Sequence, residues 1–254
     1  MGNGWYGFAL RCSKSLAEGK QYMLYNIFRV IGKNFLKIFN LKLVKIVPNH
    51  SEEILTAFAK KNKNIKFLQI GANDGISHDC LYKIVLKYKW QGVAVEPLEE
   101  FFKKLQLNYS FYNLVRPVRY ALHPTEKNMT IFKLNPLKYC DYGYWANGIA
   151  SFNKNHLIKH NILERDIIEE IVPCINLMEL ITNNNLEKID YLQIDTEGFD
   201  VEVLKMIDFN CISPKLIRFE YSNLNREELN TAIDILSNYT LKKDGSDIYA
   251  SLKE

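Results

Sequence analysis

The stretch IDYLQIDTEGFDVEVLKMID, from Ile189 to Asp208, decides the fold of this chain. Its first half is an apolar run with the length of a buried strand. The segment after the glycine has the apolar spacing of an amphipathic helix. Two carboxylates, Asp195 and Glu197, stand where the strand would end. Charged groups are costly in such a position unless they meet a partner, so the stretch predicts a strand with a binding site at its end.

Segments of strand and helix character alternate on both sides of this stretch. Ser51 precedes a segment with Glu52 and Glu53 in its first turn, which predicts a capped helix. We expect strands at 65–70, 92–97, 115–122, 189–195 and 214–220, and helices at 52–62, 77–89, 98–108, 200–208 and 225–238. Asp244-Gly245 lies between two strand-like runs and predicts a hairpin. The fold expected for residues 51–254 is therefore α/β, a Rossmann-like, doubly wound and mostly parallel sheet with a C-terminal antiparallel hairpin.

Residues 122–189 interrupt this alternation. MTIFKLNP, from Met129 to Pro136, predicts a short strand, and residues 144–172 predict a loop followed by a helix. A connection of this length inside an α/β core usually has a function of its own. We therefore expect the insertion to form a substrate platform or a lid.

Residues 1–50 form a basic region. Residues 1–51 hold eight Lys/Arg and one acid, Glu18, whereas the remaining 203 residues hold 25 basic and 28 acidic side chains. Apolar spacings of three and four between Tyr22 and Phe39 predict an amphipathic helical extension. Through residues 20–47, this extension would pack on the main domain or on a second copy of the chain, or lie on an anionic membrane surface.

The composition restricts the class of protein. With 47% hydrophobic and 24% charged residues, the 254-residue chain is typical of a globular protein. Its five cysteines are scattered, which predicts reduced thiols and argues against a zinc site. No apolar run reaches about 18 residues, so no membrane span is expected. The expected location is the cytoplasm, with contact to the inner face of the membrane through the basic extension as the alternative.

Polar residues gather where the predicted strands end, and ligands of open parallel sheets bind at that edge. Gly71 and Gly75 allow the backbone to pass close to a ligand. Glu96 follows Gly71 by 25 residues, a separation that suits a carboxylate gripping both hydroxyls of a ribose. Asp74 would repel the pyrophosphate of a nicotinamide cofactor, whereas S-adenosylmethionine is cationic and carries no phosphate. The residues therefore favour S-adenosylmethionine.

Four motifs, FLQIGANDGIS, GVAVEPLEEFF, VPCINLMELI and IDYLQIDTEGFDVEVLKMID, are similar to those of the FkbM-type methyltransferases, which have the class I S-adenosylmethionine fold. The resemblance covers about Ile65 to Ala250, and it departs at Gln69, where the family usually has Asp. It implies a seven-stranded sheet and methylation of hydroxyl oxygens, commonly on sugars or polyketides. It also implies that the methyl donor lies near Gly71, Asn73, Gly75, Glu96 and Asp195.

The strand ends and this resemblance together define the expected site. S-adenosylmethionine is expected to contact Gln69, Gly71, Asn73, Asp74, Gly75, Ser77, Glu96, Pro97, Ala121 and Asp195. The groups expected to remove a proton from the acceptor are Asp195, Glu197 and His156. The acceptor is expected to contact Tyr144, Trp145, Asn147, Ser151, His160 and Glu220. A divalent cation is not expected, and Asp195, Glu197 and Glu220 are the oxygen ligands that would hold one.

The leading hypothesis is an O-methyltransferase that acts on a small-molecule or glycan acceptor, namely a nucleotide-linked sugar or a surface glycan. Three other interpretations stay open: His156 and His160 as surface residues, Glu197 as a helix cap, and His123 as a residue that lines the adenine end or is merely a turn residue. A nucleic-acid methyltransferase is disfavoured, because DTEG replaces the Asn/Asp-Pro-Pro-aromatic motif of base methylation and the main domain is net acidic. The third hypothesis is a non-catalytic interaction module that works through the basic extension.

Overall fold

The computed structural model of the protein describes residues 50–77 and 79–253. The predicted extension, including residues 20–47, lies outside these residues apart from His50. The chain divides into two compact units, and the larger one comprises residues 48–135 and 148–254. Residues 136–147 belong to the other unit and contain two 3-10 helices, η1 (Pro136–Asp141) and most of η2 (Tyr144–Gly148).

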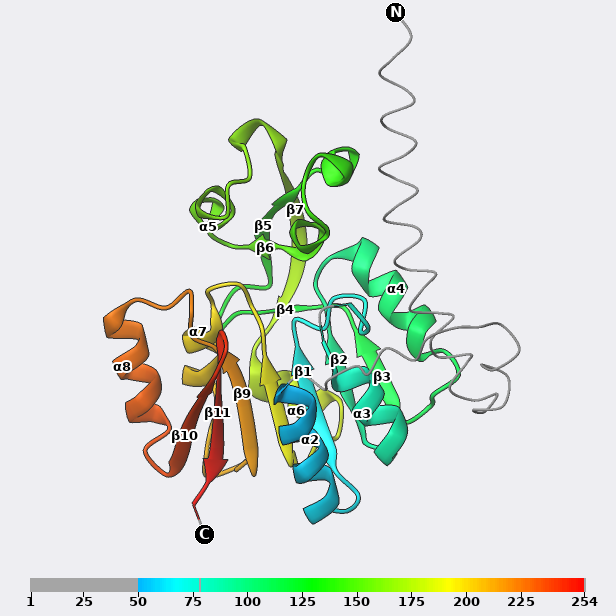
Figure 1. The fold of residues 1–254 in the computed structure, drawn as a ribbon, viewed down its shortest axis with the longest axis vertical. Coiled ribbons are helices and arrows are strands. Elements are labelled where there is room, and N and C mark those ends of the chain that lie inside the picture. The colour runs from blue at the N-terminus through cyan, green and yellow to red at the C-terminus, as the bar shows by residue number, and fades with distance from the viewer. Residues whose placement is uncertain (1–49, 78, 254) are drawn as a thin grey trace, which may run out of the picture. The chain divides into compact units, whose positions relative to one another are not determined.

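A seven-stranded sheet forms the centre of the larger unit (Figure 1), in the order β10-β11-β9-β8-β1-β2-β3. Its strands are β1 (Lys66–Ile70), β2 (Gln91–Val95), β3 (Val115–Val118), β8 (Tyr191–Ile194), β9 (Leu216–Glu220), β10 (Tyr239–Asp244) and β11 (Asp247–Leu252). The first five pair in parallel, while β11 pairs antiparallel with both β9 and β10. The predicted mostly parallel, seven-stranded sheet and C-terminal hairpin are confirmed. The reversed strand, β11, lies one position inside the edge.

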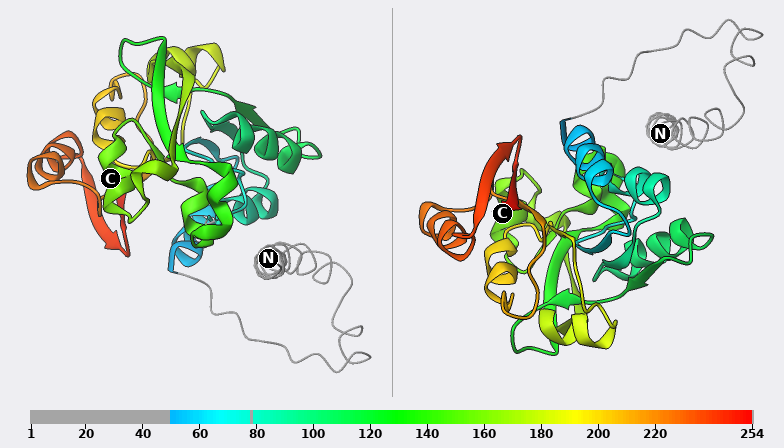
Figure 2. Two further views of the ribbon diagram at one scale, coloured as in Figure 1. Left: turned by 90° about the horizontal axis from the view of Figure 1, so that it is seen from above. Right: turned by 90° about the horizontal axis from the view of Figure 1, so that it is seen from below.

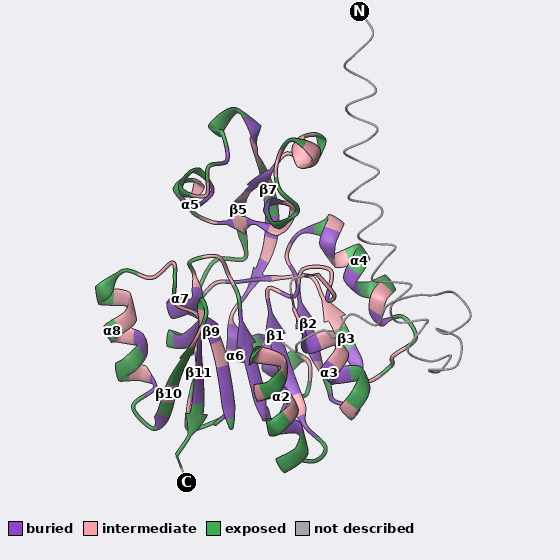
Figure 3. Cartoon of the chain, in the orientation of Figure 1, coloured by how far each residue is buried: buried purple, intermediate pink, exposed green. Residues whose placement is uncertain are grey.

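Helices cover both faces of this sheet, as the end-on views show (Figure 2). They are α2 (His50–Lys61), α3 (Leu81–Tyr88), α4 (Glu99–Tyr109), α6 (Leu177–Asn183), α7 (Asp200–Lys205) and α8 (Arg226–Ile235). Apolar residues of α2, α3 and α4 share one core cluster with Phe67 and Tyr191, and those of α6, α7 and α8 share the other with Leu68 and Leu192. Neighbouring residues of a strand point to opposite faces, so the buried strands of Figure 3 are apolar on both sides.

The connection between β3 and β8 folds into a second sheet, in the order β4-β7-β5-β6. Its elements are β4 (Ala121–Leu122), β5 (Asn128–Leu134), β6 (Ala150–Ser151), α5 (Lys154–Lys159), the 3-10 turn η3 (Glu164–Asp166) and β7 (Ile167–Ile175). The strand predicted at 129–136 is confirmed, but the predicted helix is wrong beyond Lys159. Residues 167–175 instead pair antiparallel with β5 along its whole length. Their isoleucines match a helical spacing, yet β-branched side chains favour a paired strand.

Two local predictions also differ from the structure. Ser51 lies inside the first turn of α2, where its hydroxyl donates to Asp244 Oδ2 (3.1 Å) instead of capping the helix. The single strand predicted at 115–122 is two strands that belong to different sheets. Pro117 lies on the edge strand β3, in register with Ala94 of β2. A residue without an N–H is tolerated on an edge strand.

The thiols are only partly as predicted. Cys80, Cys174 and Cys211 are free, whereas Cys140 is disulfide-bonded, so the prediction of reduced thiols is wrong for Cys140. None of the helices within the described residues has the length and apolar content needed to cross a membrane.

Candidate functional site

The order of the strands reverses at β1, and this reversal marks the edge of the sheet where a ligand is expected. From β1 the chain moves outward through β2 and β3, then returns to place β8 and β9 on the other side of β1. The reversal leaves a crevice at the carboxyl ends of β1 and β8, where open α/β sheets bind their ligands. Gly71 follows β1 and Asp195 follows β8 at this point.

A glycine loop, residues 71–75, follows β1 in an unusual backbone conformation. Gly71, Asn73 and Gly75 all have positive φ values, of 75°, 51° and 81°. A Cβ atom on Gly71 would lie 1.7 Å from the carbonyl oxygen of Asp195, so the two loops pass each other at a distance that only glycine permits. Gly148 has the same role on the other side of the loop, because its Cβ would lie 2.2 Å from Asn73 Nδ2. The sequence analysis missed Gly148.

Glu96 lies at the end of β2 and is almost completely buried. Its two carboxylate oxygens accept hydrogen bonds from the backbone N–H of Asn73 (2.8 Å) and of Leu98 (2.9 Å). Burial raises the pKa of Glu96 to about 7, against the lowering effect of these two hydrogen bonds. The two hydrogen bonds tie the glycine loop to the end of β2. Each carboxylate oxygen also has a second lone pair, so Glu96 can still accept hydrogen bonds from a ligand.

Asp195 lies at the centre of a group of carboxyl side chains. Its pKa is raised well above the ordinary range, first by desolvation and then by the negative charges of Glu197, Asp200 and Glu220. Asp195 is nevertheless exposed at the end of β8, so solvent weakens these effects on its pKa. Asp200 is fully buried, and burial raises its pKa to about 6, although Thr196 Oγ1 donates to it (2.8 Å). The edge is therefore rich in negative charge and suited to a cationic ligand.

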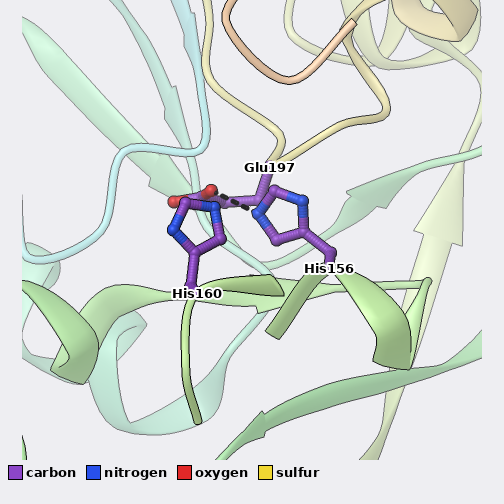
Figure 4. Close-up of side chains that lie close together, drawn as sticks. All are labelled: His156, His160 and Glu197. Carbon is purple, nitrogen blue, oxygen red and sulfur yellow. Dashed lines mark hydrogen bonds and ion pairs between the residues drawn. The ribbon is translucent and has the colours of Figure 1, made fainter. Parts of the chain in front are cut away.

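Glu197 lies in the loop after β8 and points toward α5 (Figure 4). Its Oε2 is 2.9 Å from Nε2 of the buried His156, and its carbonyl oxygen accepts a hydrogen bond from Ser151 Oγ (2.9 Å). The backbone of Glu197 has φ +50°, a conformation that costs a non-glycine residue about 1–2 kcal/mol. The His156 ring lies near Gly198, since a Cβ on Gly198 would be in ordinary van der Waals contact with it at 3.5 Å.

His160 completes a three-residue group with this pair. The rings of His156 and His160 lie 4.8 Å apart, one helical turn from each other. One ligand-type atom from each of His156, His160 and Glu197 lies within 4.8 Å of the other two. The interpretation of both histidines as surface residues is wrong for His156, and Glu197 pairs with a histidine instead of capping α7.

Comparison with known proteins now adds to this geometry. The family described as Methyltransferase FkbM domain matches residues 69–248, which is most of the chain. This chain belongs to the FkbM methyltransferase family. The resemblance noted in the sequence is thereby confirmed, and the protein is an S-adenosylmethionine-dependent methyltransferase. Comparison with curated proteins gives no significant match.

Solved structures with a similar fold include three methyltransferases. The FkbM methyltransferase from Methylobacillus flagellatus KT has 12% identity, over 74% of this chain and 43% of that chain, with a TM-score of 0.43. The O-methyltransferase from Bacillus cereus in complex with SAH has 12% identity, over 87% of this chain and 88% of that chain, with a TM-score of 0.43. The precorrin-6y C5,15-methyltransferase from Geobacter metallireducens GS-15 has 10% identity, over 84% and 94%, with a TM-score of 0.42.

The residues expected to bind the donor divide into two groups in this FkbM protein. Gly71, Asn73, Gly75, Glu96 and Asp195 lie at the crevice or tie its loops together. Asp74 instead caps its own loop, since its carboxylate accepts hydrogen bonds from the N–H groups of Ile76 and Ser77 and from the Ser77 hydroxyl. The Ser77 hydroxyl therefore also has a partner within the loop.

Three other expected donor residues take part in contacts with the protein. Gln69 is buried and its Nε2 donates to Asp79 Oδ2 (2.9 Å). The Pro97 carbonyl accepts from Arg119 Nε (3.2 Å), and Ala121 pairs with Cys174 in the second sheet. A role of these residues in donor binding stays a prediction.

The residues expected to contact the acceptor are likewise divided. Ser151 binds the Glu197 carbonyl, and Glu220 accepts hydrogen bonds from Ser222 (2.6 Å) and Asn223 (2.7 Å) in the loop after β9. In the described part of the chain, Asp195 and Glu220 do not join Glu197 in a metal-binding group. His123 is the predicted turn residue, because its Nδ1 accepts the N–H of Glu126 (2.9 Å).

The aromatic side chains expected at the acceptor lie on η2. Tyr144 and Trp145 are both about half exposed, with 49% and 47% of their surface accessible. Asn147 follows in the same 3-10 helix, and its Oδ1 is buried. The part of these three residues in acceptor binding stays a prediction.

Proposed function

We propose that this FkbM methyltransferase transfers a methyl group to a hydroxyl oxygen of a sugar, on a nucleotide-linked sugar or a surface glycan. The observation that carries the proposal is the position of Asp195. Asp195 follows β8 and its backbone passes directly beside Gly71, while the pKa of its carboxyl group is raised by desolvation and by neighbouring carboxylates. A carboxylate with a raised pKa is a stronger acceptor for the proton that a hydroxyl must lose.

The fit of the donor is supported by the glycine loop and Glu96. S-adenosylmethionine supplies a methyl group bonded to a positively charged sulfur. Glu96 would bind the ribose hydroxyls through the remaining lone pairs of its carboxylate, which two backbone N–H groups hold in place. Gly71 has no side chain, so the donor could approach the backbone of the loops after β1 and β8 closely. The carboxylates around Asp195 would balance the positive charge of the donor.

Asp195 is the residue to which we assign proton removal. The pair formed by Glu197, in the same loop, and His156, on α5, is the second group that can accept a proton. Asp195 would hold the acceptor hydroxyl and take its proton when the hydroxyl oxygen accepts the methyl group that the bound donor would supply. Loops fixed by Gly71, Gly148 and Ser151 hold these groups in position, which is the main requirement of an in-line transfer.

A sugar acceptor is favoured by Tyr144 and Trp145. Exposed aromatic rings of this kind stack on the apolar faces of sugar rings. Cytoplasmic location is part of the proposal; the free thiols of Cys80, Cys174 and Cys211 are in line with it, whereas the disulfide-bonded Cys140 is not. Contact of residues 20–47 with a membrane or with a second copy of the chain is proposed from the sequence alone.

The first test is calorimetric titration of S-adenosylhomocysteine into the full-length protein. We expect binding that weakens about a hundredfold in Glu96→Ala, since hydrogen bonds to a charged group are worth about 1.5–3 kcal/mol each. Glu169→Ala, at an exposed position of β7, is the matched control and should bind as the wild type does. Absence of binding by the folded wild type would refute the donor site.

The second part of the test concerns the atom that is methylated. The protein is incubated with S-adenosylmethionine labelled with carbon-13 at the methyl group and with a panel of nucleotide sugars and glycans. The chemical shift of the label distinguishes a methoxy group from an N-methyl or C-methyl group. Label on nitrogen or carbon would correct the assignment of O-methylation, while a methoxy product that is lost in Asp195→Asn would support it.

A further inference from the structure

The group formed by His156, His160 and Glu197 has a property that proton transfer does not require. Two imidazoles and one carboxylate meet from two separate segments, the end of α5 and the loop after β8 (Figure 4). A proton-accepting pair needs only His156 and Glu197, which already lie 2.9 Å apart. The second histidine ring, at 4.8 Å from the first, adds a third ligand-type atom to the same point.

We propose that His156, His160 and Glu197 bind one divalent transition-metal ion. The three ligand-type atoms lie within 4.8 Å of one another. Atoms bound to a common ion at about 2.0–2.2 Å lie about 3–4 Å apart, so small side-chain rotations would bring all three to bonding distance. The histidines are four residues apart on α5 and its C-terminal residue, which is the spacing that puts two rings on one side of a helix.

The ligand set selects the kind of ion. Imidazole nitrogen suits Zn²⁺, Co²⁺, Ni²⁺ and Fe²⁺, whereas Mg²⁺ and Ca²⁺ prefer sites made of oxygen atoms alone. Three protein ligands leave at least one coordination position open, as in catalytic metal sites. The cation site considered from the sequence, Asp195, Glu197 and Glu220, consisted of oxygen ligands only and did not include either histidine.

The surroundings of the group hold these ligands in place before an ion arrives. Ser151 donates to the Glu197 carbonyl, and the His156 ring lies close to Gly198. His156 is 8% exposed, so its ring is fixed by packing. A preformed arrangement of this kind loses little freedom when it binds an ion.

The ion would connect the loop that carries Asp195 with the β6–β7 connection of the second sheet. Glu197 is two residues from Asp195, and His156 and His160 belong to the β6–β7 connection. In this position the open coordination site would take an oxygen ligand, either water or the acceptor hydroxyl, whose acidity the ion would increase. This catalytic role rests on the proposed function, whereas binding of the ion does not.

The test uses the full-length protein without an affinity tag, freed of metal with a chelator. Cobalt(II) is the probe, because nitrogen and oxygen ligands in a site of low symmetry give it visible absorption that can be titrated. We expect one Co²⁺ per chain, and an affinity at least about tenfold weaker in His160→Ala and in Glu197→Gln. His50→Ala removes a histidine at the start of α2, away from the group, and should leave cobalt binding unchanged.

Two results would overturn the proposal. One is the absence of cobalt absorption in the folded wild type, and the other is equal affinity in the wild type, His160→Ala and Glu197→Gln, which would place the ion elsewhere. The buried His156 is not needed for the test, so a folding defect there does not affect it.

Titration of S-adenosylhomocysteine into the same metal-free samples separates this proposal from the function proposed above. Donor binding without cobalt binding would refute the metal site alone. Cobalt binding without donor binding would refute the proposed donor site and leave the metal site in place.

Discussion

The donor edge is the edge of the sheet at the carboxyl ends of β1, β2 and β8, where the methyl donor is proposed to bind. Replacing Glu96 by glutamine tests whether burial controls the charge of this edge. The pKa of Glu96 is raised from 4.5 to about 7, with desolvation as the largest cause. Between pH 4.5 and about pH 7, Glu96 in the folded protein holds a proton that the unfolded chain has released. Stability therefore falls as pH rises from about 4.5 to about 7, because the folded state binds more protons than the unfolded state.

The magnitude follows from the difference between the two pKa values. Ionising Glu96 in the folded protein costs about 3 kcal/mol more than in the unfolded chain, at about 1.4 kcal/mol for each pH unit between them. The glutamine side chain of the Glu96→Gln variant would carry no charge, so it would remove this cost above neutral pH. Its amide NH₂ would face the N–H of Asn73 or Leu98, which leaves one donor without an acceptor and costs about 1–3 kcal/mol at every pH.

Near pH 8 these two effects nearly cancel, so a single measurement there would not distinguish them. Near pH 5 the unsatisfied donor dominates, and Glu96→Gln should be the less stable protein. The difference in the free energy of unfolding between mutant and wild type should change by about 2 kcal/mol in favour of the mutant between about pH 5 and about pH 7.5. Asp195 and Asp200 titrate in both proteins, so their contribution largely cancels in this difference.

The assay is urea unfolding followed by circular dichroism, with the free energy extrapolated to water at each pH. Glu169→Gln, at an exposed position of β7, measures the effect of the exchange itself. If the difference between Glu96→Gln and the wild type stays constant with pH, burial does not raise the pKa of Glu96 in the way we infer. The charge of the donor edge would then need another explanation.

Two further substitutions test the structure at separate points. Gly71→Ala would place a Cβ 1.7 Å from the Asp195 carbonyl oxygen at φ +75°, so we expect a loss of at least about 2 kcal/mol in urea unfolding and weaker binding of S-adenosylhomocysteine. Its control, Gly245→Ala, has φ +59° with nothing near the added methyl group and should lose only about 1 kcal/mol; equal losses would contradict the close approach. Arg218 pairs with Asp79 (3.4 Å) and Asp247 (2.8 Å), and all three side chains are mostly shielded from solvent. Arg218→Met removes the partner of both carboxylates, so we expect the free energy of unfolding to fall by about 3–5 kcal/mol. A loss below about 1 kcal/mol would show that solvent screens these ion pairs as it does at the surface.

Most of the sheet could be predicted because its signals are local. Apolar strands, amphipathic helices and Asp244-Gly245 are each visible within a short window of sequence, and the handedness of parallel connections restricts how they assemble. The strand at 167–175 could not be identified in this way. Its residues satisfy both periods, and pairing with β5, some 40 residues earlier in the chain, decides between them.

The site was predictable to the extent that the fold itself places its residues. Gly71, Glu96 and Asp195 lie at strand ends, so their proximity follows from the order of the strands. The contact between His156 and Glu197 spans 41 residues and depends on the path of the β6–β7 connection, which no local signal describes. The spacing of His156 and His160 was visible, but their common partner was not.

Gln69 shows most clearly how neighbours in the sheet change the meaning of a residue. It stands in register with Gln193 on β8, which stands in register with Arg218 on β9, so three polar side chains lie side by side in otherwise apolar strands. Asp79, from the loop before α3, accepts hydrogen bonds from all three. Where the family usually has Asp, this chain therefore has an amide that donates to an aspartate supplied from elsewhere. A carboxylate therefore lies beside the end of β1, but a different residue supplies it, and Gln69 helps to hold this residue, Asp79, in place.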